Sequence, residues 1–292
     1  EQALLNVARD AIAARLEGRT FVVTGANTGI GKETVRGLAA RGGRVLLACR
    51  SRDKTLPVID EIRAQTGNEA LGFVPLDLED LAQVRQAAAE LLAEAPAIHV
   101  LINNAGLARS HGITKDGFER TFGVNHLGHF LLTRLLLPRI EASGPARIVN
   151  VSSHSHYRAK RIDFASLREP TQTFSGMPEY EASKLCNVLF TKELARRLEG
   201  KPVTTYALHP GVIASDIWRN VPWPLGSIAK LFMKSNEEGA ATSLYCATSD
   251  EVASHSGRYY TNCREKAPNR AANDVALARE LWEKSSEWVG LD

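Results

Sequence analysis

The chain has 292 residues, of which 44% are hydrophobic and 24% are charged, as is ordinary for a soluble globular protein. Its 36 Lys and Arg residues exceed its 33 Asp and Glu residues by only three, and they are scattered, which argues against a nucleic-acid-binding protein. No stretch of 18 apolar residues occurs, so no transmembrane helix is predicted.

The four cysteines lie far apart and form neither a C-x-x-C pair nor a Cys/His cluster of the zinc type. This spacing predicts reduced thiols, a cytoplasmic location and no metal site. Residues 1–17 lack the basic start and apolar core of a signal peptide, and their apolar spacing is that of an amphipathic helix.

Short apolar segments alternate with longer helical patterns along the rest of the chain. Strands are expected at 20–24, 44–49, 71–76, 98–102, 146–151 and 203–208. Helices are expected from the first glycine-rich segment to about 40, at 54–65, 81–93 and 118–141 (in two pieces), and from near 180 to 198. Such alternation is typical of βαβ units in a parallel sheet with helices on both faces. The sequence predicts one Rossmann-type, doubly wound α/β domain over 1–292, with about seven strands in the order 3-2-1-4-5-6-7.

Two segments of this domain are given separate roles. Residues 209–235 are interpreted as a substrate lid, and 264–292 as a C-terminal helical extension. The apolar side chains of the lid are Ile217, Trp218, Val221, Trp223, Leu225, Ile228, Leu231, Phe232 and Met233. They favour a hydrophobic substrate, although they could also be core residues. The same surface could meet a membrane or a partner, but nothing in the sequence indicates that it does.

A glycine-rich segment, 24–32, follows the first strand and opens the first helix. Glycines at 25, 29 and 31 allow a tight turn and the close approach of a pyrophosphate, which the helix N-terminus would attract. The spacing is not that of a P-loop, because Glu33 follows Lys32. The predicted cofactor contacts here are Thr24, Gly25, Asn27, Thr28, Gly29, Ile30 and Gly31. The alternative is a turn that merely joins strand to helix.

Arg50 and Ser51 come directly after the second strand, where a dinucleotide site meets the adenosine ribose. An acidic residue at this point would select NAD(H), whereas an arginine accommodates a 2′-phosphate. The nearest acid is Asp53, which is expected to lie in the next helix. The sequence therefore favours NADP(H) over NAD(H), the alternative being that these are plain surface residues.

Tyr180 and Lys184 stand four residues apart, so on a helix they would share one face. A neighbouring cation lowers a tyrosine pKa from its usual value of about 10 toward the physiological range. Such a tyrosine could act as a general acid and base. Taken alone, the pair could equally be part of a solvated helix face.

Five motifs occur in the order and rough spacing found in short-chain dehydrogenases/reductases, and the resemblance covers about residues 18–263. They are Thr24-Gly25-x-x-x-Gly29-x-Gly31, Asn103-Asn104-Ala105-Gly106, Val151-Ser152-Ser153, Tyr180-x-x-x-Lys184 and Pro210-Gly211. Other segments, among them Val124-Asn125-His126-Leu127-Gly128-His129-Phe130, resemble the retinol dehydrogenase-like branch.

The resemblance implies a role for each matching residue. Tyr180 would be the acid/base, and Lys184 would lower its pKa and hold the nicotinamide ribose. Ser153 would bind the substrate oxygen, and Asn125 would hold a water that relays protons to Lys184. The further cofactor contacts implied are Asp77, Leu78, Asn103, Ala105, Gly106, Pro210, Gly211 and Ile213.

Structural alternatives exist for several of these residues. Ser153 could cap a turn, Asn125 could satisfy a helix kink, and Asp77 could cap the helix that begins near Glu79. The 27-residue interval from Ser153 to Tyr180 is long for the family, and its insert could form a wall of the substrate pocket. Within it, His154 and His156 alternate as in a strand but lack a third ligand for a metal.

The sequence thus predicts an NADP(H)-dependent oxidoreductase that interconverts a carbonyl and an alcohol on a hydrophobic substrate such as a retinoid, steroid or lipid aldehyde. One alternative is a catalytically silent NADP(H)-binding sensor or scaffold of the same fold. Another is a different Rossmann-type enzyme such as a methyltransferase. The resemblance also implies a homodimer or homotetramer, formed through the helices that carry Asn125 and Tyr180.

Overall fold

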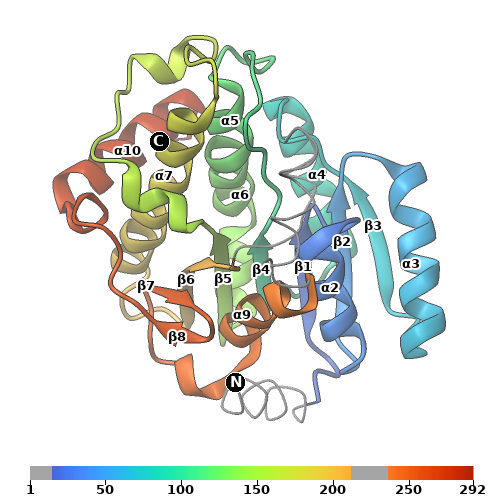
Figure 1. Ribbon diagram of the computed structural model, residues 1–292. Coiled ribbons are helices and arrows are strands. Elements are labelled where there is room, and N and C mark those ends of the chain that lie inside the picture. Colours follow the sequence, from blue (N-terminus) through green and yellow to red (C-terminus); the bar gives the residue numbers. More distant parts are fainter. Residues whose placement is uncertain (1–14, 212–235, 292) are drawn as a thin grey trace, which may run out of the picture.

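The computed structural model describes residues 15–211 and 236–291, which form an α/β domain around one eight-stranded sheet (Figure 1). The sheet order is β3-β2-β1-β4-β5-β6-β7-β8, and every neighbouring pair is parallel except β7 and β8. The strands are β1 (Thr20–Thr24), β2 (Arg44–Cys49), β3 (Leu71–Pro75), β4 (Val100–Asn103), β5 (Ala146–Val151), β6 (Val203–His209), β7 (Arg258–Thr261) and β8 (Arg264–Glu265). The predicted fold and the order of its first seven strands are confirmed. The eighth strand was not predicted, because two residues are too few to show a periodic pattern.

Some of the helices begin at side chains that accept hydrogen bonds from the free N–H groups of the first turn. They are α2 (Gly29–Ala39), α3 (Arg52–Thr66), α4 (Leu81–Glu94), α5 (Arg120–Phe122), α6 (Gly128–Ala142), α7 (Met177–Arg197), α9 (Asn236–Thr248) and α10 (Val275–Trp288). Ser51 caps α3, Asp80 caps α4 and Asp274 caps α10. Asp77 is therefore not the cap of α4; its carboxylate accepts from the Glu79 N–H in the preceding turn.

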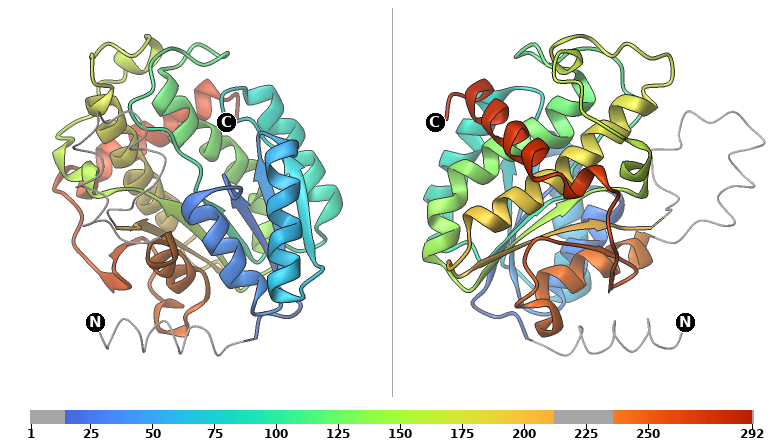
Figure 2. Two further views of the ribbon diagram at one scale, coloured as in Figure 1. Left: turned by 45° about the vertical axis from the view of Figure 1, so that its right-hand side comes forward. Right: turned by 90° about the vertical axis from the view of Figure 1, so that its left-hand side faces the viewer.

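Helices cover both faces of the sheet (Figure 2), and a hydrophobic core lies on each face. One face packs against α2, α3 and α9, through residues such as Leu38, Ile62 and Cys246. The other packs against α4, α6, α7 and α10, through residues such as Leu91 and Leu189. Because the central strands are buried on both faces, they read in the sequence as continuous apolar runs.

The C-terminal helix α10 lies against α7 (Figure 2), and its Trp282 side chain packs between Phe190 of α7 and Phe130 of α6. Its ring stacks on Phe190 at 5.9 Å between centroids and meets Phe130 edge-on at 5.1 Å. The guanidinium groups of Arg134 and Arg197 lie 5.0 and 4.4 Å from the indole. This chain thus covers, with its own helix, part of the helix pair that the resemblance assigned to a dimer interface.

The predicted N-terminal helix (1–17) and substrate lid (209–235) fall largely outside the described residues. Only 15–17 and 209–211 of these two segments are described. In the part of the chain that the structure covers, no helix combines the length and apolar character needed to cross a membrane.

Replacing Trp282 by alanine should lower the free energy of unfolding by about 3–5 kcal/mol, because it leaves a cavity where four side chains now pack. Urea denaturation followed by circular dichroism measures the loss. Val275→Ala, at the half-exposed start of the same helix, is the matched control and should change stability by less than about 0.5 kcal/mol. Equal losses in the two variants would contradict the role given to Trp282.

Candidate functional site

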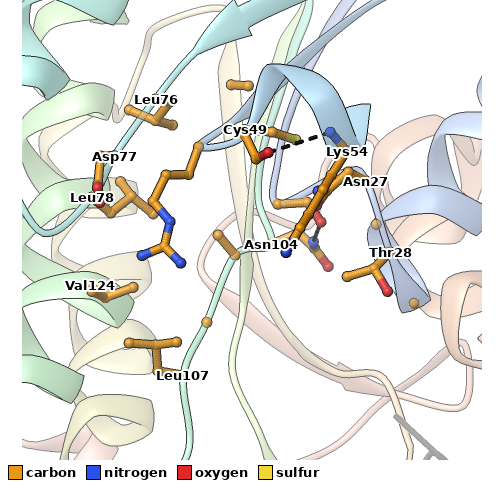
Figure 3. Close-up of a pocket in the computed structure, with 18 of the residues that line it drawn as sticks. Asn27, Thr28, Cys49, Lys54, Leu76, Asp77, Leu78, Asn104, Leu107 and Val124 are labelled. Carbon is orange, nitrogen blue, oxygen red and sulfur yellow. Dashed lines mark hydrogen bonds between the residues drawn. The ribbon is translucent and has the colours of Figure 1, made fainter. Parts of the chain in front are cut away.

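A cavity of about 730 Å³ opens at the carboxyl ends of the central strands, where the strand order reverses between β1 and β4 (Figure 3). This edge is where open α/β sheets bind their ligands. Asn27, Thr28 and Lys54 lie on one side, facing Leu76, Asp77 and Leu78 on the other (Figure 3). The predicted cofactor contacts that line the cavity are Gly25, Asn27, Thr28, Gly29, Ile30, Gly31, Arg50, Ser51, Asp77, Leu78, Ala105 and Gly106.

Several predicted contacts do not line the cavity. Asn103 points away from it: its amide donates to Thr133 and to Asn150 in the core. Pro210 and Gly211 follow β6 and do not line it, and Ile213 lies outside the described residues.

Other lining residues escaped the sequence analysis. They are Ala48, Cys49, Lys54, Leu76, Glu79, Asn104, Leu107 and Val124. Asn104 could have been found from strand alternation, because its side chain must point opposite to that of Asn103, the last residue of β4.

The glycine-rich turn has the shape that a pyrophosphate requires. Gly25 has a φ of +61°, and a Cβ there would lie 2.8 Å from the Cα of Ala105. A Cβ on Gly31 would lie 2.4 Å from the carbonyl oxygen of Gly25. The first turn of α2 contains no acidic side chain, so its positive dipole end is not neutralised. The backbone here therefore fits the diphosphate of a dinucleotide.

Thr24 connects this turn to the segment that follows β4. Its hydroxyl accepts hydrogen bonds from the backbone N–H groups of Asn104 and Ala105, at 2.9 and 3.0 Å. The amide of Asn104 in turn donates to the Thr24 carbonyl at 2.8 Å. The Thr24 side chain is fully buried and does not line the cavity, so it acts as a tie between β1 and the segment after β4.

The four predicted catalytic residues lie together beside Gly106, a lining residue, but none of them, including the predicted cofactor contacts Tyr180 and Lys184, lines the cavity itself. Tyr180 and Lys184 project from α7, with the Lys184 Nζ atom 5.6 Å from the phenol ring centroid. Ser153, which follows β5, hydrogen-bonds to Tyr180. A Cβ on Gly106 would lie 3.2 Å from the Asn125 Oδ1 atom and 3.4 Å from Lys184 Nζ. Gly106 thus joins the cavity to the catalytic residues.

Burial controls the protonation of this pair. It raises the pKa of the Tyr180 phenol, and the hydrogen bond with Ser153 only partly offsets that effect. This direction is opposite to the one predicted from the lysine alone, because the phenolate is penalised by its nearly complete removal from water. Burial also lowers the pKa of Lys184 to about 8, and its Nζ donates to the Val151 carbonyl at 3.0 Å.

Asn125 lies in a π-helical turn, Gly123–Leu127, that separates α5 from α6. Such turns often occur at functional sites. Its side-chain carbonyl accepts from the Leu107 N–H, and its amide donates to the Leu107 carbonyl and to the Ser183 hydroxyl. The amide therefore fixes the segment after β4 against α7. The sequence indicated this turn only as a break in a long helix.

His129 extends this hydrogen-bond chain. Its Nδ1 lies 3.2 Å from the Asn125 carbonyl, which can only accept, so Nδ1 carries the proton. Its Nε2 then accepts from the Thr24 hydroxyl at 2.8 Å. Burial lowers the pKa of His129 to about 4 and that of the neighbouring His126 to about 3. Both rings are therefore neutral at physiological pH.

The insert after Ser153 begins with a 3-10 helix, His154–Arg158, and not with the extended segment that the alternating histidines suggested. Within it, His156 is buried: its Nδ1 donates to the Ser153 carbonyl and its Nε2 accepts from the Asn269 N–H. The insert thereby holds the backbone carbonyl of Ser153 through the His156 hydrogen bond. No group of three or more metal-ligating side chains occurs within 15–211 and 236–291.

Because His126 and His129 are buried and neutral, we expect the free energy of unfolding to decrease at acidic pH. Because their folded pKa values lie below the ordinary 6.5, the unfolded chain binds protons that the folded chain excludes between about pH 4 and 6.5. Stability should be complete above that window and fall as pH decreases, by up to about 1.4 kcal/mol per pH unit for each histidine.

Urea denaturation at several pH values measures this slope. His129→Gln should make it shallower, whereas His111→Gln, at an exposed position, should leave it unchanged. An unaltered slope in His129→Gln would rule out this residue as a source of the acid sensitivity.

Comparison with known proteins gives consistent matches. The family model described as short chain dehydrogenase matches residues 19–223. Human retinol dehydrogenase 13 is 46% identical over 288 residues, which cover 96% of this chain and 87% of that protein.

Solved structures match as well. The crystal structure of an uncharacterised protein from Mycobacterium paratuberculosis has 34% identity and a TM-score of 0.76, with 97% of each chain covered. A protein from Beutenbergia cavernae, described as an NAD(P)-dependent gluconate 5-dehydrogenase with NADP bound at low occupancy, has 27% identity and a TM-score of 0.68. The match covers 85% of this chain and 96% of that one.

Proposed function

Because the chain belongs to the short-chain dehydrogenase/reductase family, in its retinol dehydrogenase-like branch, it is an oxidoreductase, and we propose that its cofactor is NADP(H). The proposed reaction interconverts a carbonyl and an alcohol on an apolar, retinoid-like substrate. The observation that carries this proposal is the meeting of Ser153, Tyr180 and Lys184 beside Gly106, which lines a cavity that fits a dinucleotide.

The cavity residues divide between the parts of the cofactor. The turn from Gly25 to Gly31 would hold the pyrophosphate at the start of α2. Asp77 and Leu78 would flank the adenine, and Arg50 would bind a 2′-phosphate. Asp53, the acid nearest to Arg50 in sequence, lies in α3 and is not a lining residue. When bound, the nicotinamide supplies or accepts the hydride.

The protein manages one proton. Ser153 and Tyr180 would present two hydroxyl donors to one substrate oxygen, where negative charge develops as a carbonyl is reduced. Tyr180 would donate its proton in reduction and accept one in oxidation. Lys184, charged below its pKa of about 8, would favour the phenolate that remains.

The Tyr180→Phe variant tests this assignment. It should lower kcat at least about a hundredfold, because general acid catalysis is typically worth 10²–10⁴-fold, while NADPH still binds. Fluorescence titration measures binding, and the change of absorbance of NADPH measures turnover. Tyr245→Phe, on the far face of the sheet, loses a comparable hydroxyl and should retain full turnover. Normal turnover in Tyr180→Phe would refute the assignment.

The substrate is proposed from the relatives' names and from the predicted apolar lid. With NADPH as cofactor, kcat/KM for all-trans-retinal should exceed that for short polar aldehydes by at least about tenfold, because each buried CH₂ contributes about 0.8 kcal/mol. NADH in place of NADPH should give a lower kcat/KM. A preference for polar carbonyls would contradict the proposed substrate class, and a preference for NADH would contradict the proposed cofactor.

The same assay separates the proposed enzyme from a silent sensor. A scaffold that only bound the cofactor would show no turnover with any carbonyl in the panel. The intact set of Ser153, Tyr180 and Lys184 favours the enzyme.

A further inference from the structure

Glu79 places a carboxylate at the adenosine end of the cavity, close to Arg50. Both residues line the cavity, and the Arg50 Nη1 atom lies 3.4 Å from Glu79 Oε1. A free carboxylate here would oppose an NADP(H) site in two ways. It would repel the 2′-phosphate, and it would draw away the cation that should bind that phosphate.

Arg120 prevents both effects because it forms an ion pair with Glu79. Its Nε donates to Oε2 at 3.0 Å and its Nη2 donates to Oε1 at 2.8 Å, the forked geometry in which guanidinium binds carboxylate most strongly. Arg50 makes only one long contact with the same carboxylate. Its side chain is 67% exposed, against 34% for Arg120, so Arg50 is the more loosely held of the two.

The other charged groups around Glu79 do not replace Arg120. The hydrogen bond with Glu79 raises the pKa of Arg120, and the negative charge of Asp77 adds to this effect. Asp80 is already paired with Lys115 at 2.6 Å. Lys54 lines the cavity from α3 and adds positive charge to the site, but no ion pair joins it to Glu79 among the described residues.

We propose that Arg120, which does not itself line the cavity, neutralises Glu79 and so keeps Arg50 available for a 2′-phosphate. Arg120 is then a positioning residue for cofactor selectivity. This inference rests on the proposed use of NADP(H). It makes one further claim, that Arg120 is needed only because Glu79 is present.

The test measures binding and not turnover. Isothermal titration with 2′,5′-ADP and with 5′-ADP isolates the contribution of the 2′-phosphate. Arg120→Gln should weaken 2′,5′-ADP binding at least about tenfold, in line with 1.5–3 kcal/mol for a hydrogen bond to a charged group. Binding of 5′-ADP should change less than about twofold. Because Arg50 and Lys54 remain, binding should be weakened and not abolished.

The double variant Glu79→Gln/Arg120→Gln is the decisive comparison. It removes the carboxylate together with its partner and should restore 2′,5′-ADP binding to within about threefold of the wild type. Lys115→Gln breaks the neighbouring ion pair with Asp80 and is the matched control; it should leave the ratio of the two affinities unchanged.

The outcomes are distinct. A folded Arg120→Gln variant with an unchanged ratio would overturn the inference. So would a double variant that binds 2′,5′-ADP more than about tenfold more weakly than the wild type. The double variant decides the question even if Arg120→Gln fails to fold. If instead the wild-type protein binds 2′,5′-ADP no more tightly than 5′-ADP, the proposed NADP(H) preference fails, and the selectivity role of Arg120 falls with it.

Discussion

Both halves of the site depend on the hydrogen bonds made by the buried hydroxyl of Thr24. It accepts two backbone N–H groups from the segment after β4 and donates to His129, which donates to the Asn125 carbonyl. One short chain of hydrogen bonds thus connects the cofactor turn with the π-helical turn beside Lys184. Thr24, Asn125 and His129 are buried, and leaving a buried polar group unpaired would cost about 1–3 kcal/mol. The neutral state of His129 is part of the arrangement.

Burial has opposite consequences for the two members of the catalytic pair. It disfavours the charged form of each, so it raises the pKa of Tyr180 and lowers that of Lys184. The pKa of Lys184, ordinarily 10.5 and thus slightly above that of tyrosine, falls to about 8, so the two pKa values move apart. Desolvation thus sets the direction for the Tyr180 phenol, and Ser153 offsets it only in part.

The two ends of the cavity differ in how their charges are arranged. Beside Gly106, Lys184 is the nearby cation, and its Nζ donates to a backbone carbonyl. At the adenosine end, Arg50, Glu79 and Arg120 form a row in which the central carboxylate is shared unequally. In the proposed NADP(H) site, selectivity at that end would depend on which arginine the carboxylate binds more tightly. Removing the charge of one of these three residues would therefore change how freely the other two can bind a ligand.

The sequence by itself determined the fold and most of the predicted residues that line the cavity, because these depend on local patterns. Apolar runs between helices define a parallel sheet, and the glycines at 25 and 31 are required by close backbone contacts. The direction of the Asn103 side chain, the π-helical turn at Asn125, the packing of Trp282 and the pairing of Glu79 with Arg120 were decided only by the tertiary structure. Each depends on groups that are distant in sequence, and burial, which sets the pKa of Tyr180, exists only once the chain has folded.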